Sequence, residues 1–196
     1  MQALKQMNTA KELRHPTEAK VRTRAVTADE AEVLLGLVRG RSTALAKRDR
    51  AMLELLYATG MRVTELVSLN VDDLNLDSPA PYVLFPGKTG KKRAIPIGHE
   101  TTAALSDYLT WRRPEMVHNA KERSLFVNQL GDRLSRQGFW LRLKGYTRAA
   151  NLADVSPQSF RASFARRALG SGMTVGTVQT ILGHSPGRTA STPGSR

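Results

Sequence analysis

Residues 58–66, ATGMRVTEL, connect two helical patterns through a glycine and place an arginine at the start of the second pattern. The first pattern covers residues 43–58 and repeats apolar side chains at helical spacing: Leu45, Met52, Leu53 and Leu56. Gly60 ends it, and a second helix is predicted from Arg62 to about Leu69. Glu65 lies one helical turn after Arg62, so its carboxylate can orient that guanidinium group, and an ordinary surface ion pair is compatible with this role.

An earlier helix is predicted over residues 28–38, because Thr27 and Glu30 form a capping-box pattern. Its buried face is predicted to contain four apolar side chains: Val33, Leu34, Leu37 and Val38. Gly40 is predicted to end this helix. Residues 1–25 are polar and carry charges of both signs, which predicts an arm or an interdomain linker.

The segment after the central helices changes to β-prone sequence. Residues 82–85 and 93–97 are short apolar runs, and the turn residues GKTG (87–90) separate them, so we predict an antiparallel hairpin with a basic tip. Helices are then predicted over residues 100–112, 135–150, 157–171 and 175–182. Ser156 is the predicted N-cap of the third of these, with Pro157 at its first position. The predicted fold is mainly α with a small antiparallel hairpin or sheet, forming one domain over residues 26–185, and residues 186–196 form an irregular or disordered tail.

The composition favours an anionic partner. The 196 residues carry a formal net charge of +13. Beyond Asp154 there is no acidic residue, although five arginines follow: Arg161, Arg166, Arg167, Arg188 and Arg196. Nucleic acid is the first candidate partner and a membrane surface the second.

Several classes of site are disfavoured by the composition. The chain has no cysteine, which excludes a disulfide, a zinc-thiolate site and a cysteine nucleophile within it. The four histidines are far apart and show no metal-ligand spacing, so we predict no metal and no cofactor. No apolar run is long enough to span a membrane and no signal peptide is recognisable, so we expect a cytoplasmic protein with no membrane partner.

Four stretches carry a resemblance to a known family: ATGMRVTEL (58–66), PGKTGKKRAIPIG (86–98), SPQSFRASFA (156–165) and ILGHS (181–185). In this order and at these separations they resemble the catalytic domain of the tyrosine site-specific recombinases, which are phage-integrase-like, and particularly the Xer-like branch. The resemblance extends from about Thr27 to Ser185. It implies the DNA breaking–rejoining fold of that family, duplex DNA as partner, and other recombinase subunits as further partners on the DNA.

The chemistry of that family explains the residue types. Displacement at a phosphodiester adds negative charge to the non-bridging oxygens, and guanidinium groups match that charge and geometry. The resemblance implies that Arg62 and Arg161 clamp the scissile phosphate. It implies that Lys88, at the hairpin tip, protonates the leaving 5′-oxygen and that His184 hydrogen-bonds the phosphate. The neighbours Lys91, Lys92 and Arg93 are alternatives to Lys88 as the proton donor, or contacts to DNA phosphates.

Two further arginines, Arg136 and Arg142, belong to the basic stretch before Asp154, and we predict that they contact DNA.

Two positions depart from the family pattern. Gln158 stands where the family has the histidine of an H-x-x-R motif, and a glutamine cannot exchange a proton near neutral pH. Pro193 stands near the position of the nucleophilic tyrosine, and no tyrosine follows Tyr146.

The four tyrosines present are predicted to have packing roles: Tyr57, Tyr82, Tyr108 and Tyr146. We therefore expect a recombinase catalytic domain that binds DNA and clamps a phosphate but cannot cleave as given. A truncation or frameshift, a chain cut short, or a tyrosine supplied by a partner subunit would each explain this departure. The alternative function is a non-catalytic DNA-binding or regulatory module derived from a recombinase.

Overall fold

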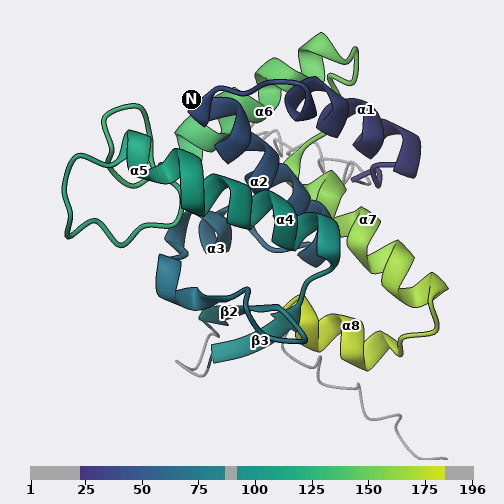
Figure 1. Cartoon of the computed structure of the whole chain (residues 1–196). Coiled ribbons are helices and arrows are strands. Elements are labelled where there is room, and N and C mark those ends of the chain that lie inside the picture. Colours follow the sequence, from purple (N-terminus) through teal and green to yellow (C-terminus); the bar gives the residue numbers. More distant parts are fainter. Residues whose placement is uncertain (1–22, 87–91, 184–196) are drawn as a thin grey trace, which may run out of the picture.

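A computed structural model describes residues 23–86 and 92–183 of the chain. It contains the helices α1 (Ala28–Arg39), α2 (Ala44–Thr59), α3 (Val63–Ser68), α4 (His99–Asp107), α5 (Arg113–Met116), α6 (Arg136–Ala149), α7 (Pro157–Gly170) and α8 (Val175–Ile181). Strands β1 (Leu74–Asn75), β2 (Tyr82–Pro86) and β3 (Lys92–Pro96) form an antiparallel sheet in that order. The sheet lies at one end of the helical body, near α3 and α8 (Figure 1). The prediction of a mainly helical fold with a small antiparallel sheet is confirmed.

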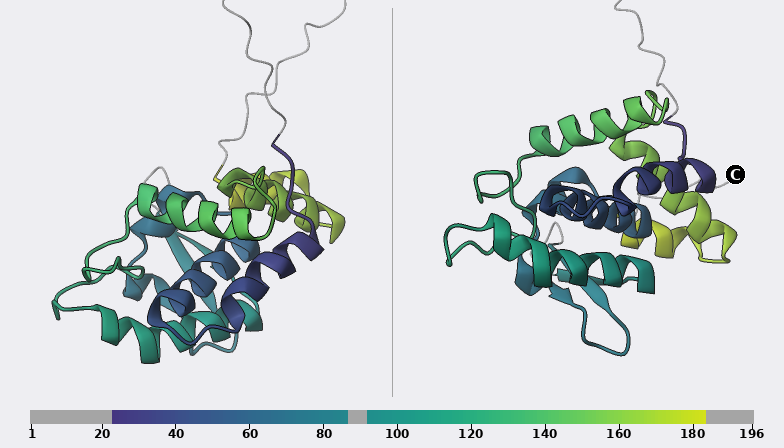
Figure 2. Two further views of the ribbon diagram at one scale, coloured as in Figure 1. Left: turned by 90° about the horizontal axis from the view of Figure 1, so that it is seen from above. Right: turned by 45° about the horizontal axis from the view of Figure 1, so that its top comes forward.

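Helix α2 is the centre of the core. It packs against α1, α4 and α7, and the two views of Figure 2 place α4 and α6 on opposite sides of it. Its side chains Met52, Leu53, Leu55 and Leu56 are each no more than 2% exposed. An element surrounded in this way fixes the relative positions of the helices that pack on it.

The corner between α2 and α3 depends on Gly60. Its φ of 62° lies in the left-handed region, and its amide donates to the carbonyl of Leu56 at 2.9 Å, which ends α2. A Cβ at this position would lie 2.7 Å from the Cβ of Phe164 on α7, so the corner packs directly on that helix. The glycine therefore brings the start of α3 against α7.

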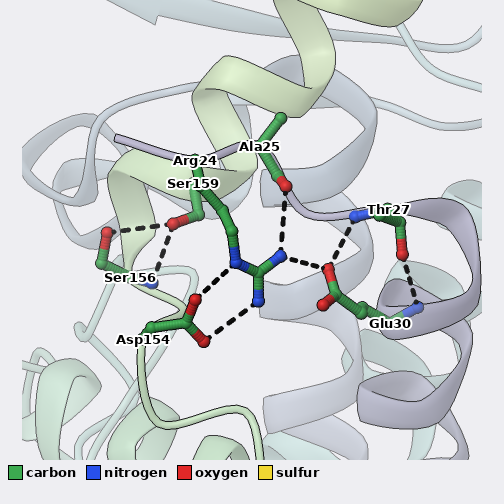
Figure 3. A network of polar contacts seen from close by, with 7 residues as sticks. All are labelled: Arg24, Ala25, Thr27, Glu30, Asp154, Ser156 and Ser159. Carbon is green, nitrogen blue, oxygen red and sulfur yellow. Dashed lines mark hydrogen bonds and ion pairs between the residues drawn. The ribbon is translucent and has the colours of Figure 1, made fainter. Parts of the chain in front are cut away.

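A polar network joins the start of α1 to the start of α7 (Figure 3). Arg24 donates to both carboxylate oxygens of Asp154 and, at 2.6 Å, to Glu30. Glu30 also accepts from the amide of Thr27 at 2.9 Å, which completes the predicted capping box. Hydrogen bonds from Arg24 hold the pKa values of Asp154 and Glu30 below their usual range. The network fixes the segment that leads into α7.

A second polar network holds α6 on α2, and the buried carboxylate of Asp49 is its centre. One oxygen of Asp49 accepts from Nε and Nη2 of Arg48, at 2.9 and 2.6 Å. The other accepts from Nε of Arg142 at 2.8 Å and from the hydroxyl of Tyr146 at 2.7 Å. Arg48 also donates to the carbonyl of Val127 at 2.7 Å. Every lone pair that this carboxylate offers inside the protein is therefore matched by a donor.

Two of the predicted helices differ from the structure. Val33 is 50% exposed and its predicted burial is wrong; Leu35 lies in the core instead, because the buried stripe of α1 is rotated. The helix predicted over residues 100–112 changes to a π-helical turn at Tyr108–Arg112 and then continues as α5. Pro114 explains this change, since it has no amide hydrogen to donate to the preceding turn.

The segment between α5 and α6 was not predicted to have structure, yet it contributes to the core. Leu125, Phe126 and Val127 are fully buried, and isolated bridges pair Asn70 with Ser124 and Val127 with Arg133. The short strand β1 was also missed, because two residues carry no periodic signal. Residues 1–22, the predicted turn at 87–90 and the predicted tail at 186–196 lie outside the described residues.

We expect that Asp49→Ala lowers the free energy of unfolding by roughly 3–5 kcal/mol, because it leaves the buried guanidinium of Arg48 without its counter-charge. Urea unfolding followed by circular dichroism measures this change. The control is Glu32→Ala, which removes an exposed partner of Arg39 and is expected to change stability by at most about 1 kcal/mol. Equal effects of the two substitutions would show that the Asp49 network does not hold α6 in place.

Candidate phosphate-binding site

A pocket of about 400 Å³ opens where the starts of α3, α6 and α7 meet. Its lining consists of three arginines, one amide and small or apolar side chains: Met61, Arg62, Val63, Thr64, Arg136, Pro157, Gln158 and Arg161. No carboxylate is among these lining residues. A pocket that concentrates guanidinium groups in this way has the charge and the donors that a phosphate group requires.

Arg62 is positioned by the helix that it begins. It is the N-cap of α3, and its backbone amide donates to Oε2 of Glu65 at 2.7 Å. Its guanidinium lies 3.5 Å from Oε1 of the same carboxylate, and its side chain remains 39% exposed. Glu65 therefore holds Arg62 more closely through its backbone amide than through its guanidinium group. The side chain of Arg62 lines the pocket.

Arg161 is held on α7, one turn after Gln158. Its Nη1 donates to the carbonyl of Gly60 at 2.9 Å, and its Nη2 donates to the carbonyl of Leu182. Burial, together with the positive charges of Arg62 and Arg93, lowers the pKa of Arg161 to about 10, and the negative charge of Glu65 opposes this shift. Arg161 remains charged at neutral pH, but its charge is held at a free-energy cost that a bound anion would offset.

Arg93 reaches the same region from β3. Its Nη2 donates to Oε1 of Glu65 at 2.9 Å, and its guanidinium lies over the ring of Phe85, 5.4 Å from the ring centre. Gly183, at the end of α8, has a φ of 64°, and a Cβ there would lie 2.8 Å from Nη1 of Arg93. The hairpin, α3 and the end of α8 therefore meet at this one side chain.

The other predicted site residues lie in different places. Gln158 is exposed in the pocket, as is Arg136. Lys92 instead bonds Asp73 at 2.8 Å, and Arg142 is held by Asp49 and Tyr146. Four predicted residues lie outside the described part of the chain: Lys88, Lys91, His184 and Pro193.

A groove missed by sequence reasoning continues the pocket along α6. It has a volume of about 660 Å³, shares Arg136 and Gln158 with the pocket, and adds Trp140 and Leu141, which are 48% and 61% exposed. The sequence indicates this face of α6 through its spacing, because every fourth residue is basic or aromatic: Arg136, Trp140, Lys144 and Arg148. In the structure all four side chains are exposed. Helix α6 contains no acidic residue.

The tyrosines make packing and hydrogen-bonding contacts. Tyr108 is fully buried and stacks on Phe126 at 5.8 Å, and burial raises its pKa to about 12. Burial also raises the pKa of Tyr146 to about 12, and its hydroxyl donates to Asp49. The guanidinium carbon of Arg167 lies over the ring of Tyr57, 3.7 Å from the ring centre. None of the tyrosines lines the arginine pocket.

Among residues 23–86 and 92–183, no three carboxylate or histidine side chains are grouped so that they could hold a metal ion. In the same part of the chain, every helix is too short or too polar to cross a membrane.

Comparisons with solved structures identify the class of fold. The crystal structure of the XerA recombinase superposes with a TM-score of 0.70 at 27% identity, over 83% of this chain and 57% of that one. The XerH site-specific recombinase bound to a palindromic difH substrate, in a post-cleavage complex, gives a TM-score of 0.71 at 25% identity, over 84% of this chain and 47% of that one. The fold is therefore that of the tyrosine recombinase catalytic domain.

Sequence comparison gives the family. The phage integrase family matches residues 24–192, and the chain belongs to that family. The tyrosine recombinase XerC of Herpetosiphon aurantiacus is 41% identical over 177 residues, which cover 90% of this chain and 57% of the relative. XerD of Oceanobacillus iheyensis is 45% identical over 158 residues, covering 80% of this chain and 52% of the relative. The chain thus spans little more than half the length of these relatives.

We expect that sulfate, which has the shape and charge of a phosphate group, stabilises the folded protein by binding in the pocket. A concentration several times its dissociation constant adds about 1 kcal/mol, or roughly 2–4 °C in Tm. Thermal unfolding in sodium sulfate is compared with sodium chloride at equal ionic strength. Arg161→Gln is expected to lose this gain and Arg123→Gln, at an exposed surface ion pair with Asp72, to keep it. An equal gain in both variants would place sulfate binding elsewhere.

Proposed function

We propose that this chain is the catalytic domain of a tyrosine-type site-specific DNA recombinase, which binds duplex DNA and holds the scissile phosphate between Arg62 and Arg161. One observation carries the proposal. The guanidinium groups of Arg62 and Arg161, from distant segments, line one pocket together with that of Arg136, and no carboxylate is among the described lining residues. The relatives named XerC and XerD and the DNA-bound XerH structure support the same function.

The pocket supplies the electrostatic part of phosphoryl transfer. The carbonyls of Gly60 and Leu182 fix the orientation of Arg161 and leave its positive charge in place. Arg62 is fixed through the N-terminus of α3, whose amide dipoles also favour an anion. The amide of Gln158 can donate a further hydrogen bond to a phosphate oxygen. Arg62, Arg161 and Gln158 are thus positioned to stabilise the negative charge that develops on the phosphate in the transition state.

By the resemblance of their sequence motifs, we assign proton donation to Lys88 and a phosphate hydrogen bond to His184. For the surrounding DNA backbone, Arg136, Lys144 and Arg148 on the exposed face of α6 provide basic contacts, with Trp140 between them for apolar contact. Lys91, Lys92 and Arg142 complete the proposed DNA contacts. Of these, Arg142 would have to share its guanidinium with Asp49.

We propose that these 196 residues bind without cleaving when they act alone, because Pro193 stands near the position of the nucleophile and no tyrosine follows Tyr146. Residues 26–185 would form the working domain, acting on DNA in the cytoplasm with other recombinase subunits. The second candidate function is a non-catalytic regulatory module that occupies recombination sites. It is favoured by Gln158, which lies in the pocket and cannot exchange protons near neutral pH.

DNA binding is expected to weaken steeply with salt, since each neutralised phosphate releases counterions. Fluorescence anisotropy with a labelled random-sequence duplex measures the affinity over a salt series. Arg62→Gln is expected to weaken binding roughly tenfold and to reduce the slope of log affinity against log salt by about 0.9. The control variant is Arg123→Gln, whose exposed side chain pairs with Asp72. Undetectable binding at low salt by the unaltered chain would end the proposal.

Restoring a nucleophile separates the recombinase from the regulatory module. Pro193→Tyr, or a grafted C-terminal segment with a tyrosine at that spacing, is expected to give covalent protein–DNA adducts on a pool of nicked duplexes of random sequence. The adducts are detected as bands that resist denaturing electrophoresis. The same chain carrying Arg62→Gln is expected to lose them. If no adduct forms while DNA binding is intact, the regulatory module is the better description.

A further inference from the structure

We propose that Arg93 is a positioning residue, whose function is to occupy the Glu65 carboxylate so that Arg62 remains available to the phosphate. The inference rests on the proposed function, because it concerns the phosphate pocket. It differs from the role predicted from sequence, in which Arg93 contacts DNA or donates a proton from the hairpin.

The geometry around Glu65 supports this division of roles. Oε2 of Glu65 accepts the backbone amide of Arg62 at 2.7 Å. Oε1 accepts Nη2 of Arg93 at 2.9 Å, whereas Nη1 of Arg62 is farther away, at 3.5 Å. An N–H···O hydrogen bond is strongest near 2.9 Å. Arg93 is therefore the nearer partner of the side chain, and Arg62 is bound mainly through its backbone.

The surroundings of Arg93 show that its guanidinium faces inward. The side chain is 21% exposed, against 55% for its neighbour Lys92. It lies over the ring of Phe85, which is fully buried, and its Nε is buried with no hydrogen-bond partner among the described residues. The backbone of Gly183 closes the other side, where even a Cβ would come within 2.8 Å of Nη1. A group enclosed in this way is poorly placed to contact DNA.

Removing Arg93 would change which arginine pairs with Glu65. The carboxylate would be left without its nearer partner, and its other ion-pair partner among the described residues is Arg62, three positions earlier in the chain and 3.5 Å away. Arg62 would then turn toward Glu65 and away from the pocket. One substitution outside the pocket lining would thus withdraw the guanidinium group of Arg62 from the pocket.

This effect has a signature in a double-mutant cycle. Arg93→Gln is expected to weaken binding of a labelled random-sequence duplex roughly tenfold at low salt, the loss expected for one charge-assisted contact. Glu65→Gln in the same chain removes the carboxylate that attracts Arg62, and its amide oxygen can still accept the amide of Arg62. The double variant is therefore expected to bind several-fold more tightly than Arg93→Gln alone.

Two further variants separate positioning from charge and from folding. Arg93→Lys keeps a cation beside Glu65 and is expected to bind within about threefold of the unaltered chain. Lys47→Gln removes the same charge at an ion pair with Asp107, outside the pocket lining, and is expected to have little effect. If Arg93→Gln binds as well as Lys47→Gln, or if Glu65→Gln fails to restore its binding, the inference is wrong.

A measurement without DNA keeps this inference distinct from the proposed function. The Nε–Hε NMR resonance of Arg62 reports its ion pairing, and inorganic phosphate is the titrant. In Arg93→Gln, we expect this resonance to move before phosphate is added, and to return in the double variant. An unmoved resonance contradicts the positioning role even if DNA binds well. A moved resonance supports it even if the unaltered chain shows no DNA affinity, a result that would overturn only the proposed function.

Discussion

Mutual repulsion among Arg62, Arg93 and Arg161 is the constraint on which the rest of this structure depends. The three guanidinium groups come from α3, β3 and α7, and they gather around the carboxylate of Glu65. Burial lowers the pKa of Arg161, and the positive charges of Arg62 and Arg93 add to this shift. The fold must therefore hold these side chains together by other interactions, such as the hydrogen bonds of Arg161 to the carbonyls of Gly60 and Leu182.

Two kinds of charged site occur in this structure. Asp49 is matched by arginine and tyrosine donors, and the Arg24 network pairs a cation with two carboxylates, so each of these charges is compensated locally. Arg161 is held by backbone carbonyls, which orient a guanidinium group without cancelling its charge. The compensated networks position α6 and α7, and Arg161 lines the pocket where these helices meet α3. Stability and binding capacity thus reside in separate groups of residues.

Sequence reasoning succeeded where the signal was local. The capping box at Thr27, the left-handed glycine after α2 and the proline at the first position of α7 are all set by neighbours within a few residues. It failed for Val33, whose exposure depends on how α1 is rotated against α2, and for the segment around Phe126, whose burial depends on contacts with distant helices. The pairing of Arg142 with Asp49 is equally long-range, and no pattern in α6 alone distinguishes it from Arg136.

The residues of the pocket could not be brought together from local sequence patterns either. That Arg62 and Arg161 lie together was implied only by the family resemblance, since nothing in the periodicity of either helix places one beside the other. The role of Arg93 required coordinates, because a basic residue in a hairpin has the same sequence pattern whether it faces DNA or a carboxylate. Its ion pair with Glu65 and its contacts with Gly183 and Phe85 support the positioning role proposed for it. Charge in this family fold is therefore best assigned by asking which carboxylates each arginine already pairs with, since a paired guanidinium group attracts a phosphate less strongly.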